Sequence, residues 1–364
     1  MIRQIRFRNF KSLRHCDLTL EPLTLLVGHN GSGKTSILEG IEFISKLLPQ
    51  IQVVDTAGKF SLNELYSIGG TEAMEIVVQQ DCGDIRLVLS NDGSVSSWDR
   101  VAGQTWGYKV APGMNAAEYK QQVEELTSTG YFQLSANEMS RTSYSDKVVP
   151  ELGHDGNGLA SVLQFMAIND RAMFEEIQSR LRLIVPTFQE IGFVRAPVEL
   201  HKKEIVRFGN ESVERMLNHT VMGESLLLSF QGAKQVPASR ASEGTILALG
   251  ILTLLRCPKR CKVLLLDDLE HGLHPLAQEQ LIEAIKLAIA SDASLQVIAT
   301  THSPYLLDYT PKESVRLIMM GSDGGSVVGK LSDHPKFEKW KEELASGEMW
   351  SLFGENWLSE GVRQ

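Results

Sequence analysis

One run of eight residues near the N-terminus limits the fold more than any other part of the sequence. Gly28-His29-Asn30-Gly31-Ser32-Gly33-Lys34-Thr35 matches the pattern G-x-x-x-x-G-K-[ST]. Residues 23–27 are apolar and predict a buried strand, and apolar residues at helical spacing follow the run as far as Pro49, where we expect the helix to end. A strand, a glycine-rich loop and a helix in this order direct backbone N–H groups to one place, so the run predicts a phosphate-binding loop.

This loop supplies the first candidate nucleotide-binding residues. The Lys34 ammonium would meet the outer phosphates, and the Thr35 hydroxyl would bind magnesium, so the sequence predicts ATP and Mg²⁺ as ligands. A chance match in a glycine-rich turn is the alternative, and the strand and helix on either side argue against it. The residues that we assign to the nucleotide are Asn30, Gly31, Ser32, Gly33, Lys34, Thr35 and Ser36.

Two apolar segments deliver polar side chains to what we expect to be the same sheet edge. Val263–Leu266 is followed by Asp267 and Asp268, and residues 295–301 are followed by His302. Ligands bind at the carboxyl ends of strands in open α/β sheets, so Asp267 is a candidate magnesium ligand and Asp268 a candidate base for the attacking water. His302 would contact the γ-phosphate. A core strand ending in a solvated acidic turn, and a structural histidine, are the alternatives.

A fourth segment precedes an apolar helix that we expect over residues 243–256. Ser242 stands at the N-cap position of this helix, and Gly244 lies in its first turn. Capping alone explains the serine. The functional interpretation is that this helix start faces the γ-phosphate of a nucleotide held by another subunit.

Taken together, these segments resemble the ABC-class ATPase heads of the SMC, RecF and OLD-like families. The closest likeness is to the stand-alone or defence-associated AAA ATPases of the OLD-like group, and it covers most of the chain. Besides residues 28–35, the matching segments are Asn9-Phe10-Lys11-Ser12 for the N-terminal strand motif, 241–245 for the signature motif, 267–275 for Walker B and the D-loop, and 301–304 for the switch histidine.

The resemblance implies a bilobed α/β fold of the P-loop NTPase type with an antiparallel β insertion. It also implies an ATP-dependent homodimer, in which Ser242 and Gly244 of one subunit close on the nucleotide of the other. Lys11 and Ser12 join the residues expected near the nucleotide.

The chain departs from the family pattern at the hydrolytic position. The family usually has Glu directly after the Walker B aspartate, where this chain has Asp268, so we expect slow hydrolysis and treat Glu270 as a second candidate catalytic residue. Gln133 is the candidate for the Q-loop, with an ordinary strand residue as the alternative. We expect neither the Toprim nuclease domain of full OLD nucleases nor the heptad coiled coils of SMC proteins.

The alternation of strand and helix patterns also divides the chain. In the expected lobe before the signature segment, Asn169 or Asp170 is the N-cap between two helices, and short strands follow over 190–230. In the expected insertion, turns fall at 81–84 and 91–93. The predicted divisions are a nucleotide-binding lobe over 1–50 and 240–320, a β-rich insertion over 51–130, a helical and β lobe over 131–239, and a C-terminal tail over 321–364.

Composition limits the partners. The formal net charge is −9, which argues against a general attraction to nucleic acid. A basic stripe of Arg3, Arg6, Arg8, Lys11 and Arg14 could still bind it, although the solvated face of an edge strand explains these residues equally well. With no apolar run of about 18 residues and no signal-like N-terminus, we expect a cytoplasmic protein outside the membrane.

The cysteines and the tryptophans of the tail add two smaller expectations. Cys257 and Cys261 are expected to be free thiols rather than metal ligands, because no histidine pair stands at ligand spacing. The tail carries three of the five tryptophans: Trp340, Trp350 and Trp357. It is expected either to pack on its own core or to dock a partner.

The activity expected from these observations is hydrolysis of ATP to ADP and phosphate, used as a conformational switch. The first hypothesis is a regulator of a separate effector protein, such as a phage-defence nuclease. A RecF-like DNA-binding repair ATPase and a non-hydrolysing ATP sensor are the alternatives. A basic stripe across the dimer would favour the former, and ATP binding without turnover the latter.

Overall fold

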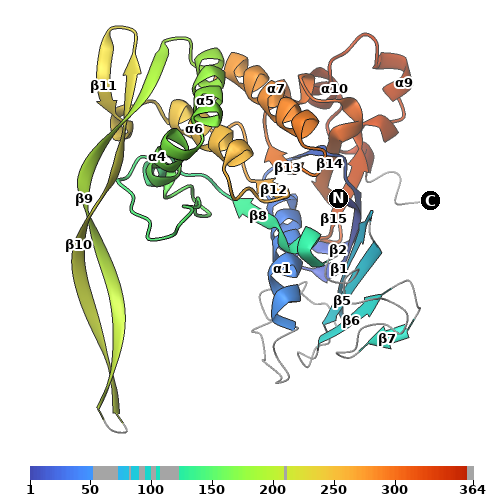
Figure 1. Cartoon of the computed structure of the whole chain (residues 1–364). Coiled ribbons are helices and arrows are strands. Elements are labelled where there is room, and N and C mark those ends of the chain that lie inside the picture. Colours follow the sequence, from blue (N-terminus) through green and yellow to red (C-terminus); the bar gives the residue numbers. More distant parts are fainter. Residues whose placement is uncertain are drawn as a thin grey trace. The chain divides into compact units, whose positions relative to one another are not determined.

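The computed structural model describes residues 1–51, 73–81, 83–89, 95–99, 104–106, 123–208 and 211–358. The chain forms two compact units, and Figure 1 labels many of their elements. Unit 1 consists of Met1–Phe132, Cys261–Glu270 and Ile282–Gln364, and unit 2 of Gln133–Arg260 and His271–Leu281.

A mostly parallel sheet forms the centre of unit 1, with its strands in the order β15-β14-β3-β13-β12-β8. Strands β14 to β8 of this order run parallel, and β15 closes one edge antiparallel to β14. Every residue of β3, β12 and β13 is buried, which explains why apolar residues predominate in β3 and make up all of β12. The bounds are β15 (Ser326–Lys330), β14 (Val315–Met320), β3 (Leu23–Val27), β13 (Gln296–Thr301), β12 (Val263–Leu266) and β8 (Thr129–Phe132).

An antiparallel sheet shares the core of unit 1, and its strands follow the order β2-β1-β4-β5-β6-β7. Because β1 lies between β2 and β4, its basic residues do not belong to an edge strand, which was the alternative explanation for them. The turn expected at 81–84 joins β4 to β5, and the one expected at 91–93 lies outside the described residues. The bounds are β1 (Ile2–Phe10), β2 (Leu13–Thr19), β4 (Met74–Gln80), β5 (Gly83–Leu89), β6 (Val95–Asp99) and β7 (Gln104–Trp106).

Helix α1 (Lys34–Ile51) starts at the P-loop lysine and packs its apolar side chains into the same core. Ile37, Ile41 and Ile44 are fully buried, as their helical spacing predicts. The helix continues past Pro49, so the predicted end at that residue is wrong. A proline in the last turn removes one backbone donor but leaves the preceding turns intact.

Unit 2 combines helices with a three-stranded sheet. As expected, Asp170 caps α5 by accepting a hydrogen bond from the backbone N of Met173 at 3.1 Å. Helix α6 is buried from Gly244 to Leu255, so it is a core helix and carries apolar residues on all sides. The helices are α3 (Ala136–Met139), α4 (Leu159–Asn169), α5 (Arg171–Ile184) and α6 (Glu243–Arg256).

Two long strands replace the short strands that we expected over 190–230. β9 (Phe188–Phe208) pairs with β10 (Glu211–Phe230) along the ribbon seen in Figure 1, and β11 (Ala233–Pro237) extends the other side of β10. The expectation of several strands is wrong because Pro197 and glycines within the strands suggest turns. Pro197 is compatible with this strand because β9 lies at the edge of the sheet, where every second backbone N–H has no neighbouring strand to bind.

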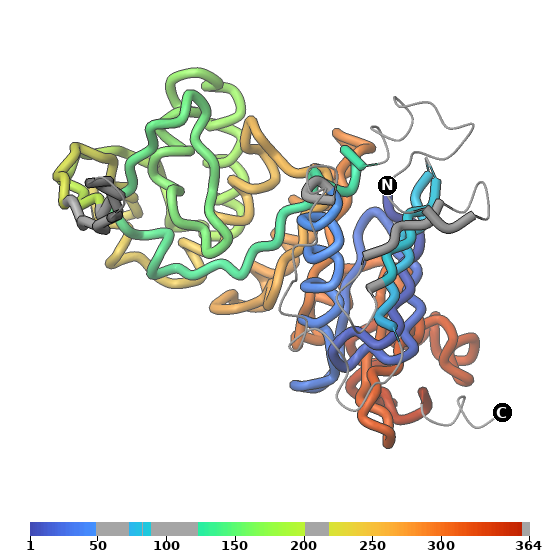
Figure 2. Tube along the Cα trace, turned by 90° about the horizontal axis from the view of Figure 1, so that it is seen from below, coloured from blue at the N-terminus to red at the C-terminus, as the bar shows by residue number. Residues whose placement is uncertain are grey.

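The chain after β13 completes unit 1. Helix α10 (Ser346–Phe353) packs on α8 (Pro304–Asp308), and β15 packs on β2, so the N-terminal strands, blue in Figure 2, and part of the C-terminal region, red there, are neighbours within unit 1. The described part of the tail, including the short α9 (Phe337–Trp340), therefore packs on its own unit, the first of the two alternatives given above.

The compact units divide the chain differently from the predicted lobes. Residues 240–260 belong to unit 2, because α6 packs on α3, α4 and α5, whereas the tail belongs to unit 1. Helix α7 (Pro275–Ser291) begins in unit 2 and continues in unit 1. Among the described residues, no helix is both long and apolar enough to cross a membrane.

Candidate functional site

Close packing within unit 1 explains why the loop between β3 and α1 needs its glycines. A Cβ on Gly28 would collide with the carbonyl oxygen of Ile318 in β14, and a Cβ on Gly33 would collide with the hydroxyl of Ser326 in β15. Gly31 and Gly33 also have positive φ angles of 76° and 105°, which other residues rarely adopt. The loop is thus held in a curled conformation by β14 and β15.

Two polar side chains of this loop are buried. Lys34 is 5% exposed, and its Nζ donates hydrogen bonds to the carbonyl oxygens of Gly28 and His29 at 2.8 and 2.9 Å. The Ser32 hydroxyl is buried without a hydrogen-bond partner in the structure. A buried ammonium and an unsatisfied hydroxyl at the N-terminus of α1 fit an anionic ligand such as a phosphate group. Asn30 is exposed and Ser36 half-buried at the same place.

Three hydroxyl groups from three elements converge on Asp267, which directly follows β12 and is 8% exposed. Its Oδ2 accepts hydrogen bonds from Tyr131 of β8 at 3.0 Å and from Thr35 of α1 at 3.2 Å. Thr300 of β13 donates to Oδ1. The predicted meeting of Thr35 and Asp267 is therefore present in the structure, and the Asp267 carboxylate is fixed in orientation.

Burial and nearby carboxylates both act on the ionisable groups of this edge. Burial lowers the pKa of Lys34, while the charges of Asp268, Asp267 and Glu270 act in the opposite direction. Burial raises the pKa of Tyr131, and the charge of Asp267 raises it further, so the phenol keeps its proton and remains a donor. The site thus gathers carboxylates around one buried ammonium.

Asp268 has an environment unlike that of its neighbour Asp267. Its side chain is 51% exposed, and its Oδ1 lies 3.9 Å from Nε2 of His302, which is 36% exposed. Its backbone has a φ of 52°, an uncommon conformation that aspartate tolerates better than most residues, and its N donates to the Thr300 hydroxyl at 2.8 Å. The two candidates of the sequence analysis, Asp268 and His302, therefore lie together and are accessible to water.

Glu270 is turned toward the backbone of the switch-histidine segment. Its Oε1 accepts a hydrogen bond from the backbone N of His302 at 2.5 Å, and its Oε2 is buried without a partner in the structure. In this position Glu270 is better placed to orient the His302 segment than to activate the attacking water.

The N-terminal strand motif lies against the loop through one of its two candidates. The Ser12 hydroxyl lies 2.9 Å from that of Ser326, and the Ser12 carbonyl oxygen accepts a hydrogen bond from Ser326 N at 2.7 Å. A Cβ on Gly33 would also crowd the Ser12 hydroxyl. Lys11, with a φ of 48°, directs its ammonium to Glu39 of α1 at 2.5 Å.

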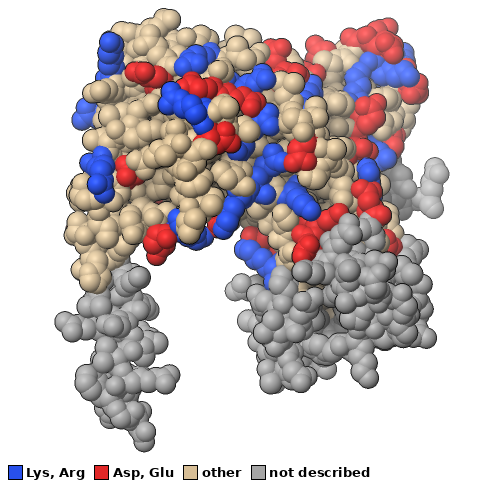
Figure 3. All heavy atoms as spheres, in the orientation of Figure 1, with Lys and Arg blue, Asp and Glu red and all other residues tan. Residues whose placement is uncertain are grey.

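Basic residues near the N-terminus are paired with carboxylates. Arg3 contacts Asp81 at 2.6 Å, Arg8 contacts Asp17 at 2.5 Å, and Arg14 lies 4.0 Å from Asp323. On the face of the molecule shown in Figure 3, the described basic and acidic side chains are interspersed. Four of the five residues of the predicted basic stripe, including Lys11, thus have an acidic neighbour.

The signature segment lies in unit 2. Ser242 caps α6, with its Oγ accepting a hydrogen bond from Thr245 N at 3.3 Å, and Gly244 is required because a Cβ there would collide with the carbonyl oxygen of Gly272. These contacts match the capping role, and the role toward a second subunit stays a prediction. Gln133 directly follows β8, is exposed, and donates its backbone N–H to His154 O at 3.0 Å. Its Q-loop assignment is also untested.

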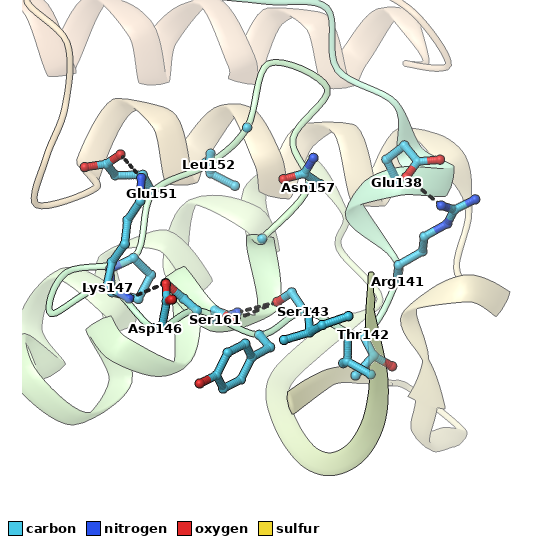
Figure 4. Close-up of a pocket in the computed structure, with 17 residues that line it drawn as sticks. Glu138, Arg141, Thr142, Ser143, Asp146, Lys147, Glu151, Leu152, Asn157 and Ser161 are labelled. Carbon is cyan, nitrogen blue, oxygen red and sulfur yellow. Dashed lines mark hydrogen bonds and ion pairs between the residues drawn. The ribbon is translucent and has the colours of Figure 1, made fainter. Parts of the chain in front are cut away.

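Unit 2 contains a separate cavity of about 440 Å³ between the 138–158 segment and β9. In Figure 4 the Ser143 and Ser161 hydroxyls point toward each other, and they lie 2.8 Å apart. Lys147 is paired with Glu151 at 2.6 Å, and Arg141 is paired with Glu138 at 2.9 Å. Because both of these cations are neutralised, the cavity is poorly suited to a polyphosphate. The described cysteines, Cys16, Cys257 and Cys261, form no disulfide with one another.

Two family models match the chain in succession. Residues 1–128 match "AAA ATPase domain", and residues 160–308 match "AAA domain, putative AbiEii toxin, Type IV TA system". Among solved structures, an SMC head bound to the C-winged helix domain of ScpA has a TM-score of 0.60 over 93% of this chain and 99% of that chain, at 14% identity. A Pyrococcus furiosus Smc head gives 0.55 over 94% and 99%, at 12% identity.

The chain belongs to the ABC-type ATPases related to RecF and OLD nuclease, and it has the fold of SMC heads. Curated relatives of this ATPase match over short segments. It is 32% identical over 109 residues to the DNA replication and repair protein RecF of Coxiella burnetii, covering 28% of this chain and 30% of RecF. It is 46% identical over 44 residues to an OLD nuclease of Thermus scotoductus, covering 12% of this chain and 8% of that protein. The chain thus spans less than a third of the length of these relatives.

Several residues at the site of this ATPase carried no signal in the sequence. Tyr131, Thr300 and Ser326 belong to no matched motif, although Thr300 precedes the Thr301-His302 pair and lies near the end of a recognisable strand. Tyr131 reaches the site because β8 pairs with β12, and Ser326 reaches it because β15 packs on β2. Neither contact can be predicted from the local sequence.

Proposed function

We propose that this chain is an ATP-dependent molecular switch that binds ATP and magnesium at the loop between β3 and α1. One observation carries the proposal: Thr35 at the start of α1 lies 3.2 Å from the Asp267 carboxylate at the end of β12. Lys34 precedes Thr35 and is buried near the carboxylates of Asp267 and Asp268. Phosphate-binding and metal-binding groups therefore meet at one sheet edge.

The oxygen atoms at this edge fit a magnesium ion. Ligands bound to octahedral Mg²⁺ at 2.0–2.1 Å lie about 3 Å apart, close to the distance between Thr35 Oγ1 and Asp267 Oδ2. Magnesium usually keeps several waters and takes only one or two protein ligands besides phosphate oxygens. Bound there, it would neutralise phosphate charge. Thr35 and Asp267 would hold it, and Tyr131 and Thr300 would keep Asp267 oriented.

Asp268 is the residue that we propose for activating the attacking water. Its exposed carboxylate can accept a proton from water, while His302 at 3.9 Å can donate a hydrogen bond to the outer phosphate. Aspartate is one methylene shorter than the glutamate usual at this position, so slow turnover is expected. Glu270 would act on the reaction indirectly, because its carboxylate holds the backbone of His302.

Turnover is proposed to require two copies of the chain. The exposed Ser242 and the first turn of α6 would close on a nucleotide held by the second copy in a two-fold arrangement. If this is correct, the specific rate of ATP hydrolysis falls as the protein is diluted below its dimer dissociation constant. An undiminished specific rate from a strictly monomeric sample, verified by sedimentation, would contradict it.

The output of the switch is proposed to be control of a separate effector protein. Two matches support this proposal. One is to the family model whose description reads "putative AbiEii toxin, Type IV TA system", and the other is the short match to an OLD nuclease. A pull-down from the native host, performed with ATP, with ADP and without nucleotide, tests this. A partner of effector type, bound in a nucleotide-dependent way, is the expected result.

The second candidate function is a RecF-like ATPase acting on DNA, favoured by the match to a DNA replication and repair protein. The net charge of −9 and the carboxylate partners of Arg3, Arg8 and Lys11 weaken this alternative. Tight ATP-dependent DNA binding at physiological salt, by a protein that is recovered without a partner, would establish it. ATP binding without turnover in the dimer would instead indicate a sensor.

A further inference from the structure

The last described residues of the chain contact the phosphate-binding loop. Glu355, which follows α10, is 2% exposed. Its Oε1 accepts a hydrogen bond from the Trp350 indole at 2.9 Å, and its Oε2 lies 3.3 Å from Nε2 of His29 in the loop. The His29 side chain is 85% exposed. A buried acid is thus joined to an accessible residue of the loop.

The same segment is fixed at its other end to the helix that follows the switch histidine. The backbone N of Gly347 donates to Asp308 of α8 at 2.6 Å, and a Cβ on Gly347 would collide with the carbonyl oxygen of Pro304. Leu358 packs so closely on β15 that a Cβ on Gly329 would collide with it. Residues 346–358 therefore contact both the loop and α8, two elements that flank the candidate nucleotide site.

Glu355 adds negative charge where the nucleotide would bring more. Its carboxylate acts on the pKa of Lys34 in the same direction as those of Asp268 and Asp267. A triphosphate at Lys34 would enter the field of a buried carboxylate, where solvent and salt screen poorly. Triphosphate binding and the contact between Glu355 and His29 therefore disfavour each other.

We propose that residues 346–358 form a nucleotide-sensitive latch, which Glu355 and His29 hold on the phosphate-binding loop and which a bound nucleoside triphosphate loosens. The proposal rests on ATP binding at that loop, as proposed above. Because coupling between two sites is reciprocal, a latch that ATP loosens must weaken ATP binding while it is closed. The latch gives the switch an output within unit 1.

Glu355→Gln tests the latch because it removes the charge and keeps an oxygen for the Trp350 indole. We expect the affinity for a non-hydrolysable ATP analogue with Mg²⁺, measured by calorimetry, to rise about fivefold, the lower end of typical coupling. Glu338→Gln is the matched control, because it removes the same charge from a side chain of the tail that is 80% exposed. Its affinity should equal that of the wild type.

A second measurement follows the latch itself. The analogue should change the tryptophan emission of the wild type, and Trp350→Phe should remove most of that change. His29→Ala, at an exposed side chain, should fold normally and make residues 346–358 more sensitive to limited proteolysis in the nucleotide-free protein.

The outcomes separate the latch from the nucleotide site. Unchanged or weaker analogue affinity in Glu355→Gln would overturn the latch, as would an unchanged protease pattern in His29→Ala. Lys34→Ala distinguishes the two proposals. If that variant binds the analogue like the wild type, the assignment of the loop fails; if it loses binding while Glu355→Gln matches the wild type, only the latch fails.

Discussion

The phosphate-binding loop of unit 1 and the cavity of unit 2 both have lysine and serine side chains with carboxylates nearby, but they differ in how charge is matched. Lys34 is buried and donates to the backbone carbonyl oxygens of Gly28 and His29. Lys147 in the cavity is 57% exposed and paired with Glu151. The Ser32 hydroxyl has no partner, whereas those of Ser143 and Ser161 satisfy each other.

This difference indicates that the phosphate-binding loop, and not the cavity of unit 2, is preorganised for an anion. Burying an ammonium costs free energy, and a phosphate ligand can offset that cost. In the cavity of unit 2, Lys147 and Arg141 are already paired with carboxylates, so a polyphosphate would have to displace existing pairs.

The largest effect should come from Asp268→Asn, which removes the proposed proton acceptor from the edge of unit 1. We expect ATP turnover to fall by about 10²- to 10⁴-fold while ATP affinity stays the same. Phosphate release under saturating ATP measures the rate, and calorimetry measures the affinity. Glu270→Gln should slow turnover less. If Asp268→Asn turns over normally and Glu270→Gln does not, the catalytic role belongs to Glu270.

Ser242→Arg should be nearly as severe, although Ser242 lies in unit 2. A bulky cation at the start of α6 would prevent the second subunit from closing, and misplaced groups commonly cost about 10² in rate. ATP binding to the single chain should be unaffected. Normal turnover in this variant would show that the signature segment takes no part in the reaction. Ser242→Ala is the control, because it removes only the cap of α6.

Tyr131→Phe should have a moderate effect on stability. It removes the hydroxyl that donates to Asp267 at 3.0 Å, and hydrogen bonds to charged groups contribute about 1.5–3 kcal/mol. Urea denaturation should show a lower midpoint with an unchanged m-value. Tyr144→Phe, at a side chain of the unit 2 cavity that is 43% exposed, should change the midpoint little. If the urea midpoint falls equally in the two variants, the Tyr131 hydroxyl contributes no more to stability than an exposed hydroxyl of the unit 2 cavity.

Lys147→Ala should have the smallest effect of all. The exposed Lys147–Glu151 pair contributes at most about 1 kcal/mol, and the cavity has no role in nucleotide binding in our account. ATP affinity should stay within about twofold of the wild type, the size of an ordinary surface substitution. A loss comparable with that of a P-loop variant would show that the cavity of unit 2 binds the nucleotide.

The sequence predicted those parts of the site that lie within short motifs. Lys34, Thr35, Asp267 and His302 each directly follow an apolar strand or begin a helix, so local patterns were sufficient to place them at one sheet edge. The α/β class and the family followed from the same motifs and are confirmed.

The parts that the sequence did not predict depend on contacts between distant segments. Tyr131 reaches Asp267 only because β8 pairs with β12, and Glu355 reaches His29 only because α10 packs on α8. The long β9–β10 ribbon was missed because Pro197 suggests a turn until its edge position is known. These pairings cannot be predicted from local sequence patterns.

The measurement that tests the central claim most directly is calorimetric titration of ATP with Mg²⁺ into the wild type, Lys34→Ala and Lys147→Ala. Circular dichroism and thermal unfolding should first establish that all three are folded. Our account predicts that the wild type and Lys147→Ala bind ATP alike and that Lys34→Ala shows no measurable binding, because it loses the buried ammonium that meets the outer phosphates. Unchanged affinity in folded Lys34→Ala would contradict the assignment of this loop as the ATP site.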